Sequence, residues 1–496
     1  MDDNKEIRGV RLVAGYLGFF LTLSGLIDLV PLLLLAFYPG ESSLAYCFLI
    51  PGGSAIGFGF FLSLLVRKKQ KGRLTRLEGS FLFVAIWIIG ILIGALPWLL
   101  CGRFSFTQAV FESTSGLSTT GLSVVDVASC PHLFLFFRSF LSFIGGVGLV
   151  LILTSAMSDH SELGLYLLEG HNDRLLPNLA KSSRTIFGIY LFYVALGSGA
   201  YLIAGLSPFD AINTAMAALS TGGFSTNPVS IAGYGSISVE IITEILMLLG
   251  ATNFVIHYFL LRARFKKAFC HHELAVFGVL VLAVYPVLVF AFAQEFGSVG
   301  AGFRFGTFEF ISAITTTGFS SVPSYSSIPS SALFCLIFLM VIGGQSGSTS
   351  GGIKQSRAAF LFFGIRRFIE KETRESNVYS TRYFHRFGEK EVITDGEISS
   401  AFSFVGLYLL IFLLGSAGLC LLGYPVERSF FEFASALGTV GLSVGIVTPS
   451  APSAVLWVEM IGMFLGRLEI LPVFSLIAQG CKMGREAFNG TRKTLA

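Results

Sequence analysis

FESTSGLSTTGLS, residues 111–123, decides the fold because it recurs in altered form three more times along the chain. The other copies are NTAMAALSTGGFS at 213–225, FEFISAITTTGFS at 308–320 and FEFASALGTVGLS at 431–443. The four copies align without gaps, and each ends in Thr, a variable residue, Gly, Leu or Phe, and Ser. One such segment would be an ordinary Gly-rich turn, but four in register indicate a repeated structural element.

The composition is that of a polytopic membrane protein. Of the 496 residues, 53% are hydrophobic and 13% are charged, and the mean hydropathy is +0.75. These values lie outside the range of soluble domains. The net charge of +4 is small, so we expect membrane lipid as the surroundings and no nucleic-acid partner. The seven Cys residues form no CxxC pair; Cys101 and Cys130 could pair outside the membrane, but free thiols are the expected state.

Hydrophobic segments of two lengths run along the chain. A bilayer core of about 30 Å requires about 20 apolar residues in a helix. Ten segments reach this length, and the first is too long for a signal peptide, so we expect it to be retained. They lie near residues 10–38, 44–66, 79–101, 133–156, 185–206, 237–261, 274–296, 331–363, 398–424 and 454–479. Four shorter segments stop at the Gly-rich turns and predict re-entrant half-helices near 107–119, 208–221, 305–316 and 428–439.

The basic residues predict the orientation in the membrane. Of the 34 Lys and Arg residues, 29 fall in six segments, at 1–11, 67–76, 174–184, 262–267, 354–390 and 482–493. The segments that follow the Gly turns contain none. By the positive-inside rule the turns open outward and both chain ends lie in the cytoplasm, so the chain is expected as a multi-pass protein of the cytoplasmic (inner) membrane.

Each repeat has the order helix, half-helix, Gly turn, helix, and starts from a basic cytoplasmic loop, so the four repeats are parallel. We predict an all-α polytopic membrane protein with four helix–pore loop–helix repeats around a central ion pathway, preceded by two extra N-terminal transmembrane helices. The predicted domains are the N-terminal extension at 1–78, pore repeats one to three at 79–160, 161–264 and 265–370, and pore repeat four with its cytoplasmic linker and tail at 371–496.

The Gly turns are candidates for a cation filter. Four short backbone segments facing one axis can replace the water around a bare cation with carbonyl oxygens. Gly allows the backbone angles that alternating carbonyls require, and the half-helices point their negative C-terminal ends toward the axis. The predicted ion-binding residues are Thr119, Thr120, Gly121, Thr221, Gly222, Gly223, Thr316, Thr317, Gly318, Thr439, Val440 and Gly441.

Three half-helices carry a Glu seven residues before the filter Thr, namely Glu112, Glu309 and Glu432, and the second repeat has Thr214 there. We interpret these carboxylates as supports that accept hydrogen bonds behind the filter. The alternatives are a negative potential at the outer mouth and direct ligation of the ion. Asp210, which opens the second half-helix, is explained by helix capping.

The chain resembles the Trk/Ktr/HKT superfamily of potassium transporters, and within it the membrane subunit of the bacterial Trk system. Beside the filter segments, the matching stretches are IGGVGLV (144–150), NFVIHY (253–258), GGQSGSTSGGIK (343–354) and GRLEILPVF (466–474). The resemblance implies potassium as the substrate, because plant relatives that transport sodium have Ser where this chain has Gly121. It also implies a homodimer that docks on a cytoplasmic nucleotide-binding regulatory subunit of the TrkA type.

The second helix of the third repeat is interrupted in mid-membrane by ten residues with five Gly and three Ser, which cannot hold a stable helix. A phosphate-binding loop is excluded because Gly352 is followed by Ile353 and Lys354 rather than by Lys and Ser or Thr. We predict a gating loop across the pore inside the filter; a wide kink around a neighbouring helix is the alternative. The predicted gating residues are Gly343, Gly344, Gln345, Ser346, Gly347, Ser348, Thr349, Ser350, Gly351, Gly352, Lys354 and Arg467.

Arg467 lies in the middle of the last apolar segment, where an Arg is costly unless it faces a cavity or a partner. We hypothesise that it holds the loop through backbone carbonyls and adds an electrostatic barrier below the filter. A structural ion pair with Glu459 or Glu469 is the alternative.

The function we expect is potassium uptake through a carbonyl-lined selectivity filter gated by the intramembrane loop, with no cofactor in this chain. The alternatives are a sodium- or proton-coupled potassium symporter of the same fold and a non-selective monovalent cation channel. A voltage-gated four-repeat channel is disfavoured because no helix carries Arg at every third position. A membrane-embedded enzyme is disfavoured because the spans contain few ionisable residues.

Overall fold

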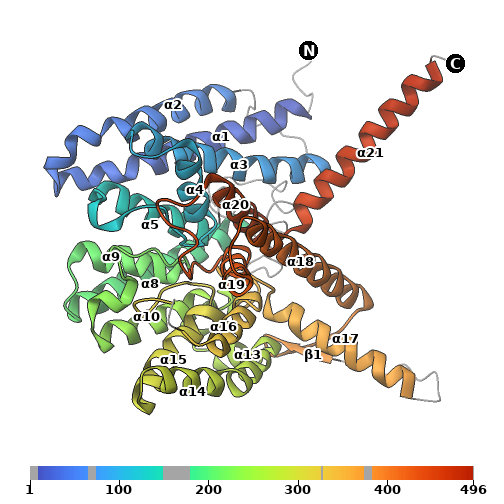
Figure 1. Ribbon diagram of the computed structural model, residues 1–496. Helices are drawn as coiled ribbons and strands as arrows, with labels where there is room; N and C mark the ends of the chain where they lie inside the picture. Colours follow the sequence, from blue (N-terminus) through green and yellow to red (C-terminus); the bar gives the residue numbers. More distant parts are fainter. Residues whose placement is uncertain (1–8, 65–73, 149–178, 326–327, 374–382, 495–496) are drawn as a thin grey trace.

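A computed structural model describes residues 9–64, 74–148, 179–325, 328–373 and 383–494 (Figure 1). Among these, six helices are long and apolar enough to cross a membrane, or up to eight if each of two bent helix pairs is one span. The strands in the described ranges form one short hairpin, β1 (Tyr383–Arg386) with β2 (Glu389–Val392), which the sequence analysis did not predict. The predicted all-α polytopic class is confirmed.

Two helices precede the repeats and pack along each other. This extension consists of α1 (Val10–Leu29), the 3₁₀ segments η1 (Val30–Ala36) and η2 (Pro39–Leu44), and α2 (Tyr46–Ser63). Glycines bring the two helices together, because a Cβ added at Gly25 would lie 2.5 Å from the Gly52 carbonyl oxygen and one at Gly59 would lie 2.6 Å from that of Gly18. Small residues at helix contacts allow this backbone approach in a membrane.

Four units of helix, half-helix and helix follow. The first consists of α3 (Arg76–Leu100), α4 (Phe106–Leu117), η3 (Val127–Ser129) and α5 (His132–Val147). The second consists of α8 (Leu179–Ile203), α9 (Pro208–Leu219), η5 (Ser230–Tyr234), α10 (Ile237–Gly250), α11 (Phe254–Leu261) and α12 (Phe265–Phe269). The third consists of α13 (His272–Ala283), α14 (Tyr285–Glu295), α15 (Val299–Ile314), α16 (Ser330–Val341) and α17 (Gln355–Thr373). The fourth consists of α18 (Asp395–Leu421), α19 (Val426–Leu437), α20 (Ser453–Arg467) and α21 (Leu471–Thr494).

The units form a closed ring. The second helix of each unit packs against the half-helix of the next, in the pairs α5 with α9, α10 with α15, α16 with α19, and α20 with α4. The last pair joins unit four to unit one. The half-helices α4, α9, α15 and α19 therefore lie toward the middle of the molecule, and the ends of all four approach one region.

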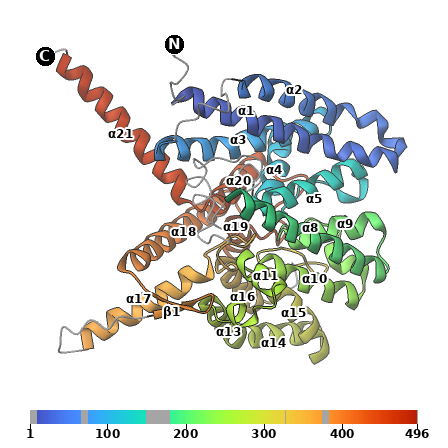
Figure 2. The same ribbon diagram turned by 180° about the vertical axis from the view of Figure 1, so that it is seen from behind.

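The described chain ends lie on one side of the molecule. The start of α1 and the free end of α21 lie on the same side as the hairpin and the far end of α17, in both views (Figures 1 and 2). Helix α21 projects away from the bundle (Figure 2).

Two of the predicted long segments are bent. The segment predicted near 237–261 is broken between α10 and α11, which meet at 108°, and the segment predicted near 454–479 is broken between α20 and α21, which meet at 99°. In the second case Glu469 and Ile470 have φ angles of 56° and 59°, which no helix continues through. The predicted span near 133–156 is described as far as Gly148, and its remainder lies outside the described residues, as does the boundary predicted at 160–161.

We predict that Gly59→Leu lowers the stability of the N-terminal extension, because its side chain would meet the backbone of Gly18 and Thr22. Overpacking of this kind costs about 1–3 kcal/mol. Gly57→Leu on the same helix is the matched control, because a Cβ there meets nothing within 4 Å. The measurement is the melting temperature of the purified protein in detergent. Equal melting temperatures for the two variants would show that the close approach of α1 and α2 is not needed.

Candidate functional site

The four predicted filter segments have one backbone conformation. The first Thr of each has a left-handed φ, at 58° for Thr119, 52° for Thr221, 54° for Thr316 and 51° for Thr439. The filter glycines are also left-handed, with φ between 61° and 102°. A β-branched residue in this region is a strained outlier, and its recurrence in all four units indicates a geometry that the fold imposes.

Hydrogen bonds at the half-helix ends hold this conformation. In unit one the Thr119 N–H donates to the Gly116 carbonyl at 3.0 Å and the Thr120 N–H to the Ser115 carbonyl at 2.9 Å. The pattern is the Schellman helix end, with Thr at the position that Gly usually occupies. The same two bonds recur in the other three units. At the end of each half-helix this turn directs the backbone into the filter segment.

The filter glycines close the ring by backbone contact between units. A Cβ built on each would collide with the carbonyl oxygen of the middle filter residue of the following unit. The distances are 2.4 Å from Gly121 to Gly222, 2.2 Å from Gly223 to Thr317, 1.9 Å from Gly318 to Val440, and 2.0 Å from Gly441 to Thr120. The last contact returns to the first unit. Four filters therefore surround one axis, and a side chain at any of these glycines would displace a neighbouring carbonyl.

The three half-helix glutamates are fully buried and accept hydrogen bonds from the segment behind their own filter. Glu112 accepts from the Ser123 hydroxyl at 2.9 Å and the Val124 N–H at 3.2 Å. Glu432 accepts from the Ser443 hydroxyl at 2.6 Å and the Val444 N–H at 2.9 Å. Glu309 does the same for Ser320, Ser321 and Tyr325. The predicted hydrogen bonds from the segment behind the filter to these carboxylates are present.

Unit two uses a different acid. Asp210 accepts a hydrogen bond from the Ser207 hydroxyl at 2.8 Å, which belongs to the helix cap, and another at 2.5 Å from Thr226, just beyond the filter. Asp210 therefore supports the segment behind the second filter as well as the helix start. Capping alone, which the sequence suggested, was an incomplete explanation.

Arg138 of α5 joins the first two filters and was not singled out in the sequence. Its guanidinium donates to the Ser123 hydroxyl at 3.1 Å, lies 3.6 Å from a Glu112 carboxylate oxygen, and donates to the Ser225 carbonyl of unit two. It is 2% exposed and lies 4.9 Å from the Phe224 ring centroid. A buried Arg in a predominantly apolar segment is the sequence signal that could have identified it.

The predicted gating loop lies against the filter threonines. Helix α16 ends at Val341 and α17 begins at Gln355. The Thr221 hydroxyl donates to the Thr349 hydroxyl at 3.1 Å, and the Gly351 N–H donates to the Thr316 hydroxyl at 2.9 Å. A Cβ on Gly351 would lie 2.1 Å from the Thr439 hydroxyl. The loop therefore touches three of the four filters from the side of their first residues.

The residues at the break between α10 and α11 form hydrogen bonds with this loop. The Gln345 N–H donates to the Ala251 carbonyl at 3.1 Å, and the Asn253 side-chain amide donates to the Ser346 carbonyl at 2.6 Å. The Phe254 N–H donates to the Gly347 carbonyl at 3.0 Å. Polar backbone exposed at the break is thus satisfied by polar backbone of the loop, which is why neither segment continues as a helix.

Arg467 and Lys354 both contact loop carbonyls. Arg467 donates to the Thr349 carbonyl at 2.7 Å and also to the Gly145 carbonyl of α5. Lys354 is buried, and its ammonium donates to the Ser350 carbonyl. The hypothesised contact between Arg467 and the loop backbone is therefore present, while Glu469 forms an ion pair with Arg357 at 2.5 Å. The role of these residues in gating stays a prediction.

Two filter hydroxyls have no partner in the described part of the chain. These are the Thr119 and Thr439 hydroxyls, and both side chains are fully buried. The corresponding hydroxyls of Thr221 and Thr316 bond to the loop. A buried hydroxyl without a hydrogen bond is a candidate oxygen ligand for a cation.

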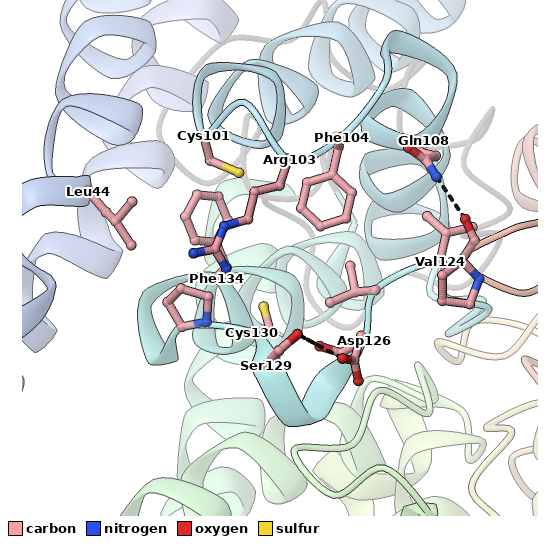
Figure 3. Close-up of a pocket in the computed structure, with 13 residues that line it drawn as sticks. Leu44, Cys101, Arg103, Phe104, Gln108, Val124, Asp126, Ser129, Cys130 and Phe134 are labelled. Atoms are coloured by element: carbon pink, nitrogen blue, oxygen red, sulfur yellow. Dashed lines mark hydrogen bonds between the residues drawn. The ribbon is translucent and has the colours of Figure 1, made fainter.

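A cavity of about 260 Å³ lies beside residues 124–126, which follow the first filter, and Figure 3 shows its lining. Cys101 and Cys130 both line it as free thiols, so the alternative of a Cys101–Cys130 disulfide is not seen. Burial raises the pKa of the Cys130 thiol to about 12. Gln108 spans the cavity edge to the Pro449 carbonyl of unit four at 2.9 Å (Figure 3). None of the described lining residues belongs to the filter.

Comparison with known proteins gives consistent matches over nearly the whole chain. Residues 59–482 match the TrkH family, described as cation transport protein. An uncharacterised cation transporter of Methanocaldococcus jannaschii is 31% identical over 480 residues, which cover 96% of each chain. The Trk system potassium uptake protein TrkG of Escherichia coli is 30% identical over 487 residues, covering 95% of this chain and 98% of that protein. The crystal structure of the potassium transporter TrkH from Vibrio parahaemolyticus has a TM-score of 0.83 at 26% identity, covering 95% of this chain and 98% of that chain.

We predict that Arg138→Met loosens the junction between filters one and two, because it leaves Glu112 buried without its cation. Removing one partner of a buried ion pair costs about 3–5 kcal/mol. Hydrogen exchange of the backbone amides at 120–126 and 222–227, followed by mass spectrometry, should become faster. Arg103→Met is the control, because Arg103 is exposed. Unchanged exchange in both segments would rule out the bridging role of Arg138.

Proposed function

This chain belongs to the TrkH family of cation transport proteins, and we propose that the cation it carries is potassium, taken up through the four-segment filter under control of the loop at 343–352. Membership makes the chain a multi-pass membrane transporter rather than an enzyme. The observation that carries the proposal is the ring of glycine-to-carbonyl contacts between neighbouring filters.

Carbonyl oxygens supply the selectivity in this proposal. The variable middle residue of the filter is Thr120, Gly222, Thr317 or Val440, so its side chain cannot be what the four units share. The backbone is shared, and the carbonyl of each middle residue lies against the filter Gly of the preceding unit. A ring of carbonyls suits a weakly hydrated monovalent cation such as potassium. The names of several relatives, which specify potassium uptake, agree with this assignment.

The gate in this proposal is the loop at 343–352, on the inner side of the filter. The loop touches the first residue of three filters, and Arg467 fixes it to α5 and α20 at once. In this arrangement the loop blocks the path, and the guanidinium adds a positive barrier for a cation. Opening requires the loop to leave the filter threonines.

The assembly and orientation also belong to this proposal. We infer a homodimer in the inner membrane, with both chain ends cytoplasmic and a cytoplasmic nucleotide-binding subunit as regulator. The clustering of basic residues supports the orientation, because the start of α1, the hairpin and α21 share one side of the molecule. The relatives' designation as parts of a Trk system supports a partner.

Changing filter glycines tests the substrate and the site together. Gly318→Ser and Gly441→Ser should each reduce rubidium uptake about tenfold or more in cells that lack their own potassium uptake. In each variant the new side chain displaces a filter carbonyl. A loss of only about 1.4 kcal/mol in the binding free energy of the ion lowers its affinity tenfold. Gly300→Ser, in the first turn of α15, is the control, because Gly300 is helical and a Cβ there meets nothing within 4 Å.

Harmless substitutions at all four filter glycines would overturn the filter assignment. Equal uptake of sodium and rubidium by the unchanged protein would favour a non-selective channel, and uptake that requires a sodium or proton gradient would favour a symporter.

The gate is tested separately by Arg467→Ala and by deletion of 346–351. Each should raise rubidium flux in the absence of regulation, because each removes contacts that hold the loop below the filter. A charge-assisted hydrogen bond contributes about 1.5–3 kcal/mol, so the increase should reach about tenfold. Flux and regulation that stay unchanged in both variants would contradict the gate.

A further inference from the structure

Glu273 fastens both ends of the gating loop, although it lies on a different helix. It is the second residue of α13 and is fully buried. One of its carboxylate oxygens accepts hydrogen bonds from the Ser346 N–H at 3.0 Å and from the Ser356 N–H at 3.1 Å. These two residues flank the segment that touches the filter. The Ser346 and Ser356 hydroxyls also bond to each other at 2.5 Å.

One carboxylate oxygen of Glu273 faces the loop, and the other faces His271. His271 lies 3.5 Å from its other oxygen, but burial lowers the pKa of His271 to about 3, so that ring is neutral near pH 7. The Glu273 N–H donates to the His271 ring nitrogen at 3.3 Å, which agrees with an unprotonated nitrogen there. A carboxylate that accepts two backbone N–H groups forms the stronger, charge-assisted kind of hydrogen bond.

The hairpin of β1 and β2 packs against the start of α13, immediately before Glu273. The Gly388 N–H donates to the Cys270 carbonyl at 3.0 Å, and His272 Nδ1 lies 3.2 Å from the His385 carbonyl oxygen. The Phe384 ring lies 4.9 Å from the His272 ring and 5.5 Å from that of Phe360, on α17. The hairpin therefore contacts the helix that carries Glu273 and the helix that leaves the loop.

The tip of the hairpin also lies at this contact. Phe387 has a φ of 49° and Gly388 one of 82°, the left-handed conformations that a two-residue hairpin turn requires. Its ring lies 4.8 Å from the His271 ring and 5.8 Å from that of Phe259. The Phe387 side chain therefore packs between the start of α13 and α11 at the tip of the hairpin.

We propose that Glu273 is a positioning residue of the gate, and that the hairpin at 383–392 sets its place. The inference rests on the proposed function of the loop. In the docked state the hairpin holds the start of α13, Glu273 holds both loop ends, and the loop stays against the filter threonines. Movement of the hairpin would shift one carboxylate and loosen both ends of the loop together.

The test uses the full chain with Ser348→Cys as a reporter in the loop. Glu273→Ala should increase labelling of the introduced thiol by a thiol reagent, located by mass spectrometry, and should raise rubidium flux. Each effect should be on the order of tenfold, because two charge-assisted hydrogen bonds are lost. Glu273→Gln should lie between the parent and Glu273→Ala, since its amide oxygen can accept both N–H groups but carries no negative charge. Glu295→Ala, at the exposed end of α14, is the matched control.

The hairpin is tested by Phe387→Ser, with Lys390→Ser in the exposed face of β2 as its control. Phe387→Ser should raise labelling and flux in the same direction as Glu273→Ala, and the double variant should show less than the product of the two changes, because both act on one contact. The ratio of rubidium to sodium flux should stay at the parent value in all of them, which a general loss of folding would not leave intact.

Three results would overturn the proposal: labelling at parental levels in Glu273→Ala, equal behaviour of Glu273→Gln and Glu273→Ala, or no effect of Phe387→Ser. If labelling rises as expected but no variant or parent carries rubidium, the positioning role of Glu273 stands and the proposed transport function fails.

Discussion

Contact between the backbones of neighbouring filters is the constraint on which the rest of the structure depends. Each filter Gly abuts the carbonyl of the following unit, and the fourth returns to the first. The half-helices must therefore end at one place with one conformation, which explains the strained threonines and the buried acids behind them. The second helix of a unit must also lie close to the end of a half-helix. Cβ atoms built on Gly145, Gly250 and Gly466 would lie 2.0–2.3 Å from the carbonyl oxygen of the last residue of a half-helix.

The third unit departs from this scheme where control is proposed. In the other units a Gly of the second helix packs on the half-helix end, whereas α16 stops at Val341 and the loop takes over. The loop then needs partners for its polar backbone. Those partners come from the break after α10, from Arg467 and from Glu273, which belong to units two, four and three. The one irregular segment is thus held from several sides.

The elements that recur in all four units could be predicted from the sequence, whereas features that occur once were missed. Four Gly turns in register led to the parallel units, the half-helices and the supporting glutamates, because repeated residues report a repeated geometry. The breaks at 251–253 and 468–470 were missed, because Ala251, Leu468 and Ile470 are unremarkable in an apolar segment and the reason for each break lies in another unit. Arg138 and the hairpin were missed for the same reason, since their partners are distant in sequence.

The gating loop also bears on why four units are joined in one chain. It occupies the inner side of a shared axis and already touches the first residues of three filters. Four identical subunits would each bring such a loop to the same space, and at most one could fit. A single polypeptide with divergent units can instead keep the symmetric surroundings that a cation requires while placing such a loop in one unit only. A chain whose four units differ is then required if one loop is to lie on the axis.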